Sequence, residues 1–103
     1  MIDYNDYLFI DCAKLILNYV KSQKSNIYLK DIHEIIKKSN IFRYVNRNND
    51  EKSQRYELNQ IIRASLTKLE IFDSKYQILD NYIIIIDQNN EYIINFQEKE
   101  GDT

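Results

Sequence analysis

The chain has 103 residues, of which 44% are hydrophobic and 29% are charged, and its formal net charge at pH 7 is −2. This length predicts a single domain over residues 1–103, with its core in 7–96 and an acidic, frayed tail at 97–103. No apolar run reaches the roughly 18 residues of a membrane span, and the acidic start is unlike a signal peptide. We therefore expect no membrane segment and a cytoplasmic location, which would be the host cytoplasm or nucleoid for a viral protein.

Scarce residue types exclude several kinds of site. The chain has no proline and a single glycine, Gly101, whereas phosphate-binding loops need glycine where the backbone approaches the ligand. One cysteine, Cys12, and one histidine, His33, cannot make a metal centre of the usual Cys/His type. No nucleophile is evidently paired with His33. We expect no catalytic residue, no metal and no cofactor, and hence a protein that is not an enzyme.

The first predicted element is a helix over residues 6–21. Its apolar arc is wider than packing on one surface requires, and one stripe of it contains Phe9, Cys12, Ile16 and Tyr19. This stripe is a candidate interface for a homodimer. The alternative is a helix that lies wholly inside a small core, and there Cys12 is a small buried hydrophobe rather than a nucleophile.

The next elements are shorter. Residues 26–29 read as a brief extended segment, and residues 30–39 as a second helix that buries its isoleucines. Residues 40–52 form a connector whose first part, 41–45, is anchored by apolar side chains and could make a short helical turn. Its last part, 46–52, is wholly polar and is expected to be a loop.

A long third helix is predicted in residues 53–72, with Asp50 or Ser53 as its N-cap. Its apolar positions recur at helical spacing and define a buried stripe: Leu58, Ile62, Ser65, Leu66 and Leu69. The opposite side carries polar groups one turn apart: Tyr56, Asn59, Gln60, Arg63 and Thr67. The helix therefore offers aliphatic groups to the core and hydrogen-bonding groups to solvent.

After Phe72 the pattern changes from helical to strand-like. Residues 82–86 and 92–96 are rich in β-branched and aromatic side chains, and the polar residues 87–91 between them predict a hairpin turn. Residues 76–79 are a candidate third strand, joined to the hairpin through a turn at 80–81.

The order of these elements resembles the winged helix-turn-helix domain. The resemblance lies in residues 28–32, the entry to the second helix, in residues 62–72, the end of a recognition helix, and in the hairpin 82–96, the wing. It implies an α+β fold with three helices followed by a C-terminal β-hairpin. Two features depart from the family: the link before the third helix is long, and the wing tip carries Asp87 and Glu91 but no basic residue.

The resemblance implies binding of double-stranded DNA, with helix 53–70 in the major groove. Asn59 and Gln60 would then contact adenine edges, Arg63 guanine, and Ser53 and Tyr56 phosphate. Further phosphate contacts would come from Lys37, Lys38, Arg43, Arg47, Lys52 and Arg55. Residues 30–68 carry a net charge of +4 and residues 69–103 one of −6, as expected if only the middle of the chain meets an anion. The predicted role is a small regulator of transcription, replication or partition in a phage, plasmid or low-GC organism.

The alternative function is a protein-interaction module of the same fold, such as a docking or inhibitor protein of a mobile element. The acidic C-terminal third and the acidic wing tip favour it. The distribution of positive charge over residues 30–68 distinguishes the two functions. One continuous patch would favour DNA binding, whereas a patch interrupted by Asp31, Glu34 and Glu57 would favour protein interaction.

Overall fold

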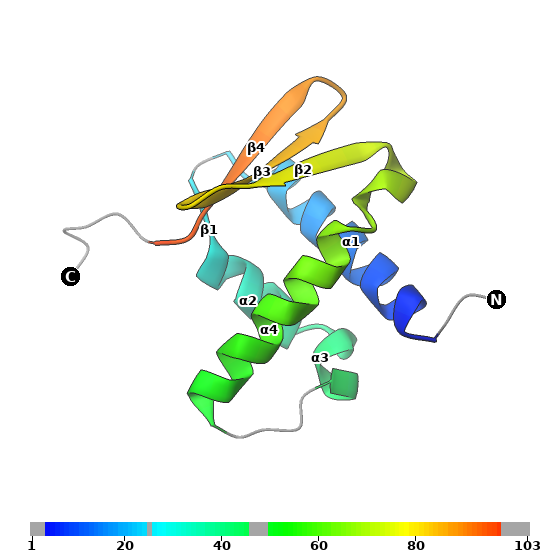
Figure 1. Cartoon of the computed structure of the whole chain (residues 1–103), viewed down its shortest axis with the longest axis vertical. Coiled ribbons are helices and arrows are strands. Elements are labelled where there is room, and N and C mark those ends of the chain that lie inside the picture. Colours follow the sequence, from blue (N-terminus) through cyan, green and yellow to red (C-terminus); the bar gives the residue numbers. More distant parts are fainter. Residues whose placement is uncertain (1–3, 25, 46–49, 98–103) are drawn as a thin grey trace.

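The computed structural model describes residues 4–24, 26–45 and 50–97, and within them the fold is α+β (Figure 1). Four α-helices, one 3-10 helix and a four-stranded mixed sheet make up this described part. In chain order the elements are α1 (Tyr4–Ser22), β1 (Ile27–Tyr28), α2 (Leu29–Lys37), α3 (Asn40–Val45), α4 (Glu51–Leu66), η1 (Leu69–Phe72), β2 (Ser74–Ile78), β3 (Tyr82–Asp87) and β4 (Asn90–Asn95).

The sheet has the strand order β1-β4-β3-β2. β2, β3 and β4 form an antiparallel meander, whereas the short β1 lies parallel to β4. The Asn95 side chain donates to the backbone carbonyl of Ile27 at 3.2 Å and so ties β1 to β4. The candidate strand at 76–79 is thus confirmed as β2, and the expected two-stranded hairpin is part of a larger sheet.

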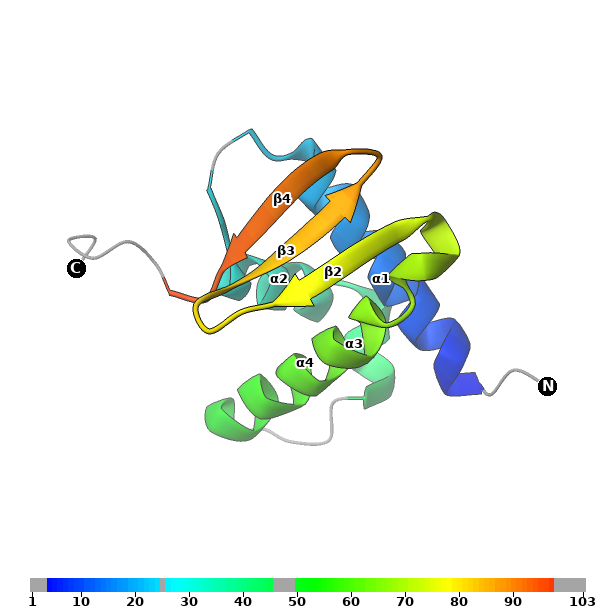
Figure 2. The same cartoon turned by 45° about the horizontal axis from the view of Figure 1, so that its top comes forward.

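The helices gather on one side of this sheet (Figures 1 and 2). Strand residues alternate between two faces, so Ile83, Ile85 and Asp87 of β3 are buried toward the helices. Tyr82, Ile84 and Ile86 lie on the other face and are only half-buried. The core therefore lies between the sheet and the helices, and the outer face of the sheet remains partly open.

The apolar face of α1 is buried in the core, while Asp11, Lys14 and Asn18 on its other face are exposed. Cys12, Ala13, Ile16 and Val20 have no exposed surface at all, and α1 contacts α2, α3, α4 and η1. Two of the four residues of the candidate dimer stripe, Cys12 and Ile16, are thus enclosed by the chain itself. They cannot meet a second subunit while the core is closed, so the candidate dimer interface is wrong for these two residues. Phe9 and Tyr19, the other two, are half-buried.

Helix α4 begins at Glu51 because Asp50 caps it: the Asp50 carboxylate accepts a hydrogen bond from the backbone N–H of Ser53 at 2.9 Å. The helix ends at Leu66, earlier than the predicted 70–72. The hydroxyl of Thr67 donates to the carbonyl of Ala64 at 2.6 Å, and the N–H of Lys68 bonds to Ser65 three residues back. These bonds use carbonyls that a continuing α-helix would need.

The chain then forms the separate turn η1, which Asp73 ends in the left-handed region at φ 59°. Its Leu69 is fully buried, and η1 contacts α1. The predicted buried stripe of α4 is nevertheless confirmed, because Leu58, Ile62, Ser65 and Leu66 are all buried. The short helical turn expected at 41–45 is confirmed as α3.

Candidate nucleic-acid interface

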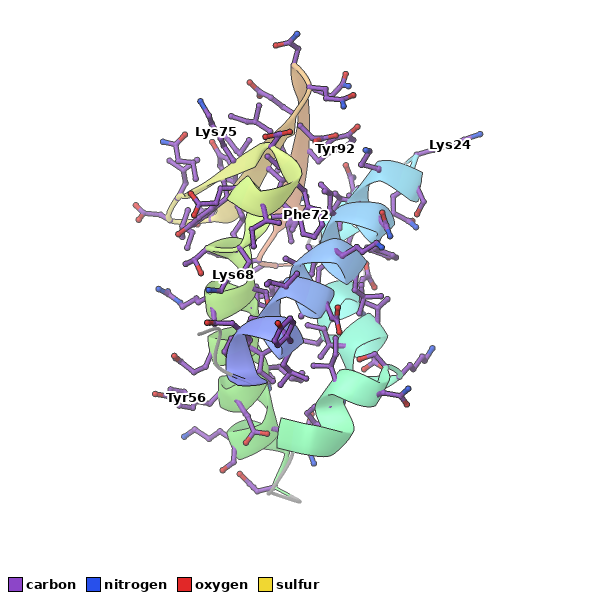
Figure 3. The ribbon with its side chains drawn as sticks, turned by 90° about the vertical axis from the view of Figure 1, so that its right-hand side faces the viewer. Lys24, Tyr56, Lys68, Phe72, Lys75 and Tyr92 are labelled. Atoms are coloured by element: carbon purple, nitrogen blue, oxygen red, sulfur yellow. The ribbon has the colours of Figure 1, made fainter. Side chains whose placement is uncertain are left out.

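The exposed side of α4 presents the groups expected from the sequence. Residues 52, 56, 59 and 63 follow one another at about one helical turn, with residues 55, 60 and 67 beside them. We call this surface the α4 stripe: Lys52, Arg55, Tyr56, Asn59, Gln60, Arg63 and Thr67. All of its members except the half-buried Asn59 are exposed, and the Tyr56 ring, 68% exposed, projects from the helix (Figure 3). The stripe itself contains no carboxylate.

Asn59 has a structural partner that the sequence did not reveal. Its Oδ1 lies 2.7 Å from Nε2 of His33, which is 8% exposed, and the contact links α4 to α2. Burial lowers the pKa of His33, opposed by the hydrogen bond to Asn59, so the ring is neutral at pH 7. With Oδ1 accepting from the ring, the Asn59 amide nitrogen is the group left for another ligand.

The other predicted phosphate contacts differ in their exposure and in the partners that they already have. Lys38 is exposed, Lys37 lies 3.6 Å from Glu34, and Ser53 is half-buried with its N–H used in the helix cap. Arg47 lies outside the described residues, as does the side chain of Arg43. The loop expected at 46–52 is likewise described only from residue 50, where it is the start of α4.

The α4 stripe carries three cations, and the neighbouring groove carries charges of both signs. Between α2 and α4 a groove of about 230 Å³ is lined by Lys30, Lys37 and Arg55 together with Glu34 and Glu51. Glu57 is half-buried and lies one turn before Gln60, and the exposed Glu51 lies one turn before Arg55. Asp31 is half-buried too. The groove therefore carries mixed charge, and carboxylates border the α4 stripe on both sides.

The hairpin differs from the expected acidic tip. Asp87 is 4% exposed, its Oδ2 lies 3.0 Å from Nζ of Lys21, and its Oδ1 accepts from the Ser74 hydroxyl at 2.6 Å. The hydrogen bond from Ser74 and the contact with Lys21 lower the pKa of Asp87. Asp87 is therefore a structural anion that joins α1, β2 and β3, and its assignment as a free charge at the tip was wrong. The turn itself is Gln88 and Asn89, both at positive φ.

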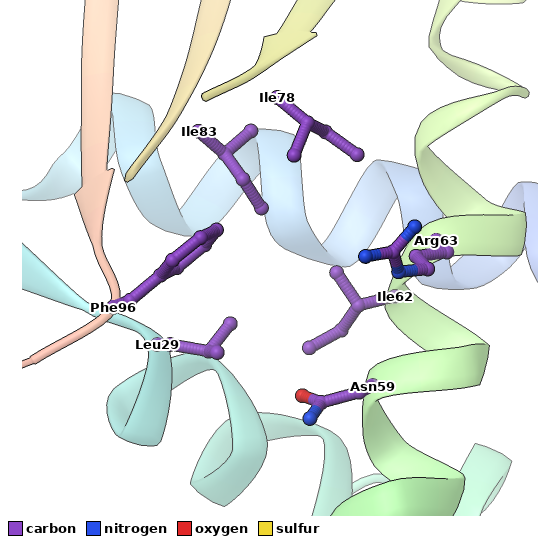
Figure 4. A pocket seen from close by; sticks show the side chains of 7 residues that line it. All are labelled: Leu29, Asn59, Ile62, Arg63, Ile78, Ile83 and Phe96. Carbon is purple, nitrogen blue, oxygen red and sulfur yellow. The ribbon is translucent and has the colours of Figure 1, made fainter. Parts of the chain in front are cut away.

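A second feature of α4 was missed from the sequence. Arg63 and Asn59 line the rim of a pocket of about 290 Å³ between α4, the start of α2 and the sheet (Figure 4). Its apolar walls come from Leu29, Ile62, Ile78, Ile83 and Phe96. These residues lie far apart in the chain, so no local sequence pattern could have grouped them.

Other candidate chemistry is sparse in the part of the chain that the structure describes. Cys12 is buried, and burial raises the pKa of its thiol to about 11, which leaves the reactive thiolate almost unpopulated at pH 7. Within residues 4–24, 26–45 and 50–97, no three His, Cys, Asp or Glu side chains are grouped as a metal site would require. In the same residues no helix combines the length and the apolar character of a membrane span.

Comparisons of this chain with protein-family models, curated proteins and solved structures found no match.

Proposed function

We propose that this protein binds double-stranded DNA, with the exposed face of α4 in the major groove, as a small regulatory protein of the winged-helix type. The observation that supports the proposal is the α4 stripe, where three cations, an amide and two hydroxyls face solvent without a carboxylate among them. An α-helix fits the major groove of B-DNA, and such side chains bond both phosphates and base edges.

The members of the stripe divide into two roles under this proposal. Arg63 and Gln60, in the C-terminal half of α4, contact guanine and adenine edges. Lys52 and Arg55, near its N-terminus, contact phosphates, as does the exposed Lys38 directly after α2. Asn59 is the weaker base reader, because contacting adenine through both amide atoms requires breaking its bond to His33.

A dimer that reads two half-sites remains part of the proposal, but through another surface than the core of α1. β2 is an edge strand of the described sheet, with Tyr76 and Ile78 each 38% exposed. Unpaired strand edges join readily to other strands. Sedimentation of the wild type beside Tyr76→Lys tests this: the wild type should be dimeric and the variant monomeric. A monomeric wild type at high concentration contradicts it.

The direct test of DNA binding is fluorescence anisotropy with random and AT-rich duplexes over a series of salt concentrations. Three to five phosphate contacts predict a slope of log affinity against log salt of about −3 to −4.5. Lys52→Gln should reduce the slope by about 1. The matched control is Lys14→Gln, which removes an exposed cation of α1 and should leave the slope unchanged. Absence of binding at low salt would refute the proposal.

Arg63→Ala tests the reading of bases on any preferred sequence. Loss of a guanine contact should remove about 1–3 kcal/mol of discrimination between the preferred site and random DNA, with a smaller loss on random DNA. The measurement is the ratio of the two dissociation constants for wild type and variant. An equal loss on both duplexes would assign Arg63 to phosphate binding alone.

One observation favours protein docking as a second candidate function. The outer face of the sheet presents Ile84, Ile86 and Ile93, of which Ile93 is 45% exposed, and no described element covers them. Contiguous exposed apolar surface often marks a protein interface. Under this alternative, Ile93→Gln abolishes capture of a specific partner while Arg63→Gln does not. Loss of capture in Arg63→Gln but not in Ile93→Gln would show instead that the partner binds to α4.

A further inference from the structure

The pocket beside α4 has the composition of a small-ligand site. Ile62 and Ile83 are buried at its base, while Phe96 and Leu29 are half-buried along its sides (Figure 4). Ile78, at the end of β2, has 38% of its surface exposed and completes the wall near the opening. An apolar cleft with a few convergent polar groups is the usual form of a ligand pocket.

The polar groups of this pocket lie on one side and favour an anion. Figure 4 shows the guanidinium of Arg63 and the amide of Asn59 both directed from α4 toward the cleft. Among the described residues Arg63 has no ion pair, and the bond to His33 leaves the Asn59 amide nitrogen as a donor. The guanidinium supplies two parallel N–H donors that match the two oxygens of a carboxylate, and the Asn59 amide, on the other side of Ile62, adds a further donor to the pocket.

The volume of the pocket limits the ligand. About 290 Å³ is at the small end for ligand sites. A small ligand with a medium-length apolar body therefore suits the pocket better than a large one.

We propose that this pocket binds a small amphipathic carboxylate, with its apolar body against Ile62, Ile83 and Phe96 and its carboxylate on Arg63 and Asn59. One consequence rests on the proposed DNA binding. Because Arg63 belongs to both sites, the bound carboxylate neutralises a cation that DNA needs, and the two ligands compete. The pocket then makes the α4 stripe responsive to a metabolite of this class.

The first experiment uses octanoate and the protein without DNA, observed through the methyl NMR signals of the isoleucines. Octanoate should shift Ile62, Ile78 and Ile83 in a saturable way and leave Ile93, on the outer face of the sheet, unchanged. Octanamide, of the same length but uncharged, should bind at least tenfold more weakly. Saturable shifts at Ile84, Ile86 and Ile93 instead, or equal binding of both compounds, would overturn the proposal.

Two charge-matched variants then test the role of Arg63. Arg63→Gln should weaken octanoate binding about tenfold and leave octanamide binding unchanged. Lys14→Gln, which removes an exposed cation of α1 that lines none of the pockets described above, should bind octanoate like the wild type. Equal octanoate affinities in the two variants would overturn the carboxylate contact. The methyl spectrum itself reports that each variant is folded.

A final titration separates this proposal from that of DNA binding. Octanoate should release a bound duplex from the wild type, at constant ionic strength, over the same concentrations that shift the pocket methyls. Octanoate binding by a protein that binds no DNA would support the pocket and refute the DNA proposal. DNA binding without saturable methyl shifts would support the DNA proposal and refute the pocket. Simultaneous binding of octanoate and DNA would refute the competition between them.

Discussion

Single side chains fix how the elements are joined, and Asp87 shows this most directly. It sits at the end of β3, yet its two oxygens contact Lys21 at the end of α1 and Ser74 at the start of β2. The side chain of Lys21 is 43% exposed and that of Asp87 only 5%, so the carboxylate is the enclosed partner. A buried carboxylate is tolerated only when its oxygens are bonded, which is the case here.

Asp87→Asn should destabilise the protein by about 1–2 kcal/mol, because it removes the charge from two charge-assisted bonds. Urea unfolding at pH 7 measures this difference. Glu91→Gln, the same chemical change at an exposed position of the hairpin, should cost little. The pKa of Asp87 is lowered in the fold, so its stabilisation is present above its unfolded pKa and lost as pH falls through the folded pKa. The free energies of unfolding of the wild type and Asp87→Asn should therefore become equal in acid.

His33 gives the same sign of pH dependence as Asp87, but at a higher pH. Its pKa is lowered from 6.5, so below pH 6.5 the unfolded chain takes up the proton before the folded one does. The stability of the wild type should decline from about pH 6.5 downward, before the carboxylates titrate. His33→Gln should flatten this part of the profile. An identical pH dependence in the variant would exclude His33 as its origin.

At the scale of elements, α4 is defined by polar groups at its ends. The Asp50 carboxylate supplies the first bond, and the hydroxyl of Thr67 and the i to i+3 bond of Lys68 end it. The apolar positions 58, 62, 65 and 66 then fix which side faces the core. Because that side is buried, the α4 stripe must face solvent. The packing of the apolar face thus decides which polar side chains of α4 are exposed.

Asp50→Ala should lower the urea midpoint and shorten α4 at its N-terminus, since the N–H of Ser53 loses its acceptor. Asp50→Asn is the matched control, because an amide oxygen can still cap the helix and should retain most of the stability. Urea unfolding followed by circular dichroism measures the midpoint of both variants, and amide exchange at Ser53 locates the change. Equal loss in the two variants would assign the effect to the charge of Asp50 rather than to its hydrogen bond.

At the scale of the whole molecule, α1 is the helix around which the others pack. Its fully buried residues meet α4, α2, α3 and η1, and the ion pair of Asp6 with Lys68 at 3.0 Å joins its first turn to the chain after α4. A helix face buried in this way contributes to the stability of every neighbour. It does not offer Cys12 or Ile16 to a second subunit.

Ile16→Glu should therefore prevent cooperative folding rather than produce a folded monomer. Burying a carboxylate at a site with no exposed surface costs at least about 4 kcal/mol, a large part of the stability of a domain this small. Ile93→Glu, the same substitution on the exposed face of the sheet, should fold normally. Near-UV circular dichroism and urea unfolding distinguish the two. A folded Ile16→Glu variant would contradict the enclosed position of α1.

Much of the local structure was predictable from the sequence. The helices at 6–21 and 30–39, the turn at 41–45, the strands at 82–86 and 92–96, the Asp50 cap and the buried stripe of α4 were all expected and are confirmed. The exposure of Arg55, Tyr56, Gln60 and Arg63 followed from the same periodicity. These features depend on groups one to four residues apart, and such spacings can be read along the chain.

Only the tertiary structure decided the partners of residues that are distant in sequence. The bond of His33 to Asn59, the pairing of Asp87 with Lys21 and the pocket that joins Arg63 to Phe96 each combine separate elements. The sequence likewise left open whether α1 faced a core or a second subunit, because a wide apolar arc fits both. Packing resolves these alternatives, since the position of one element relative to another is set by all of their contacts together.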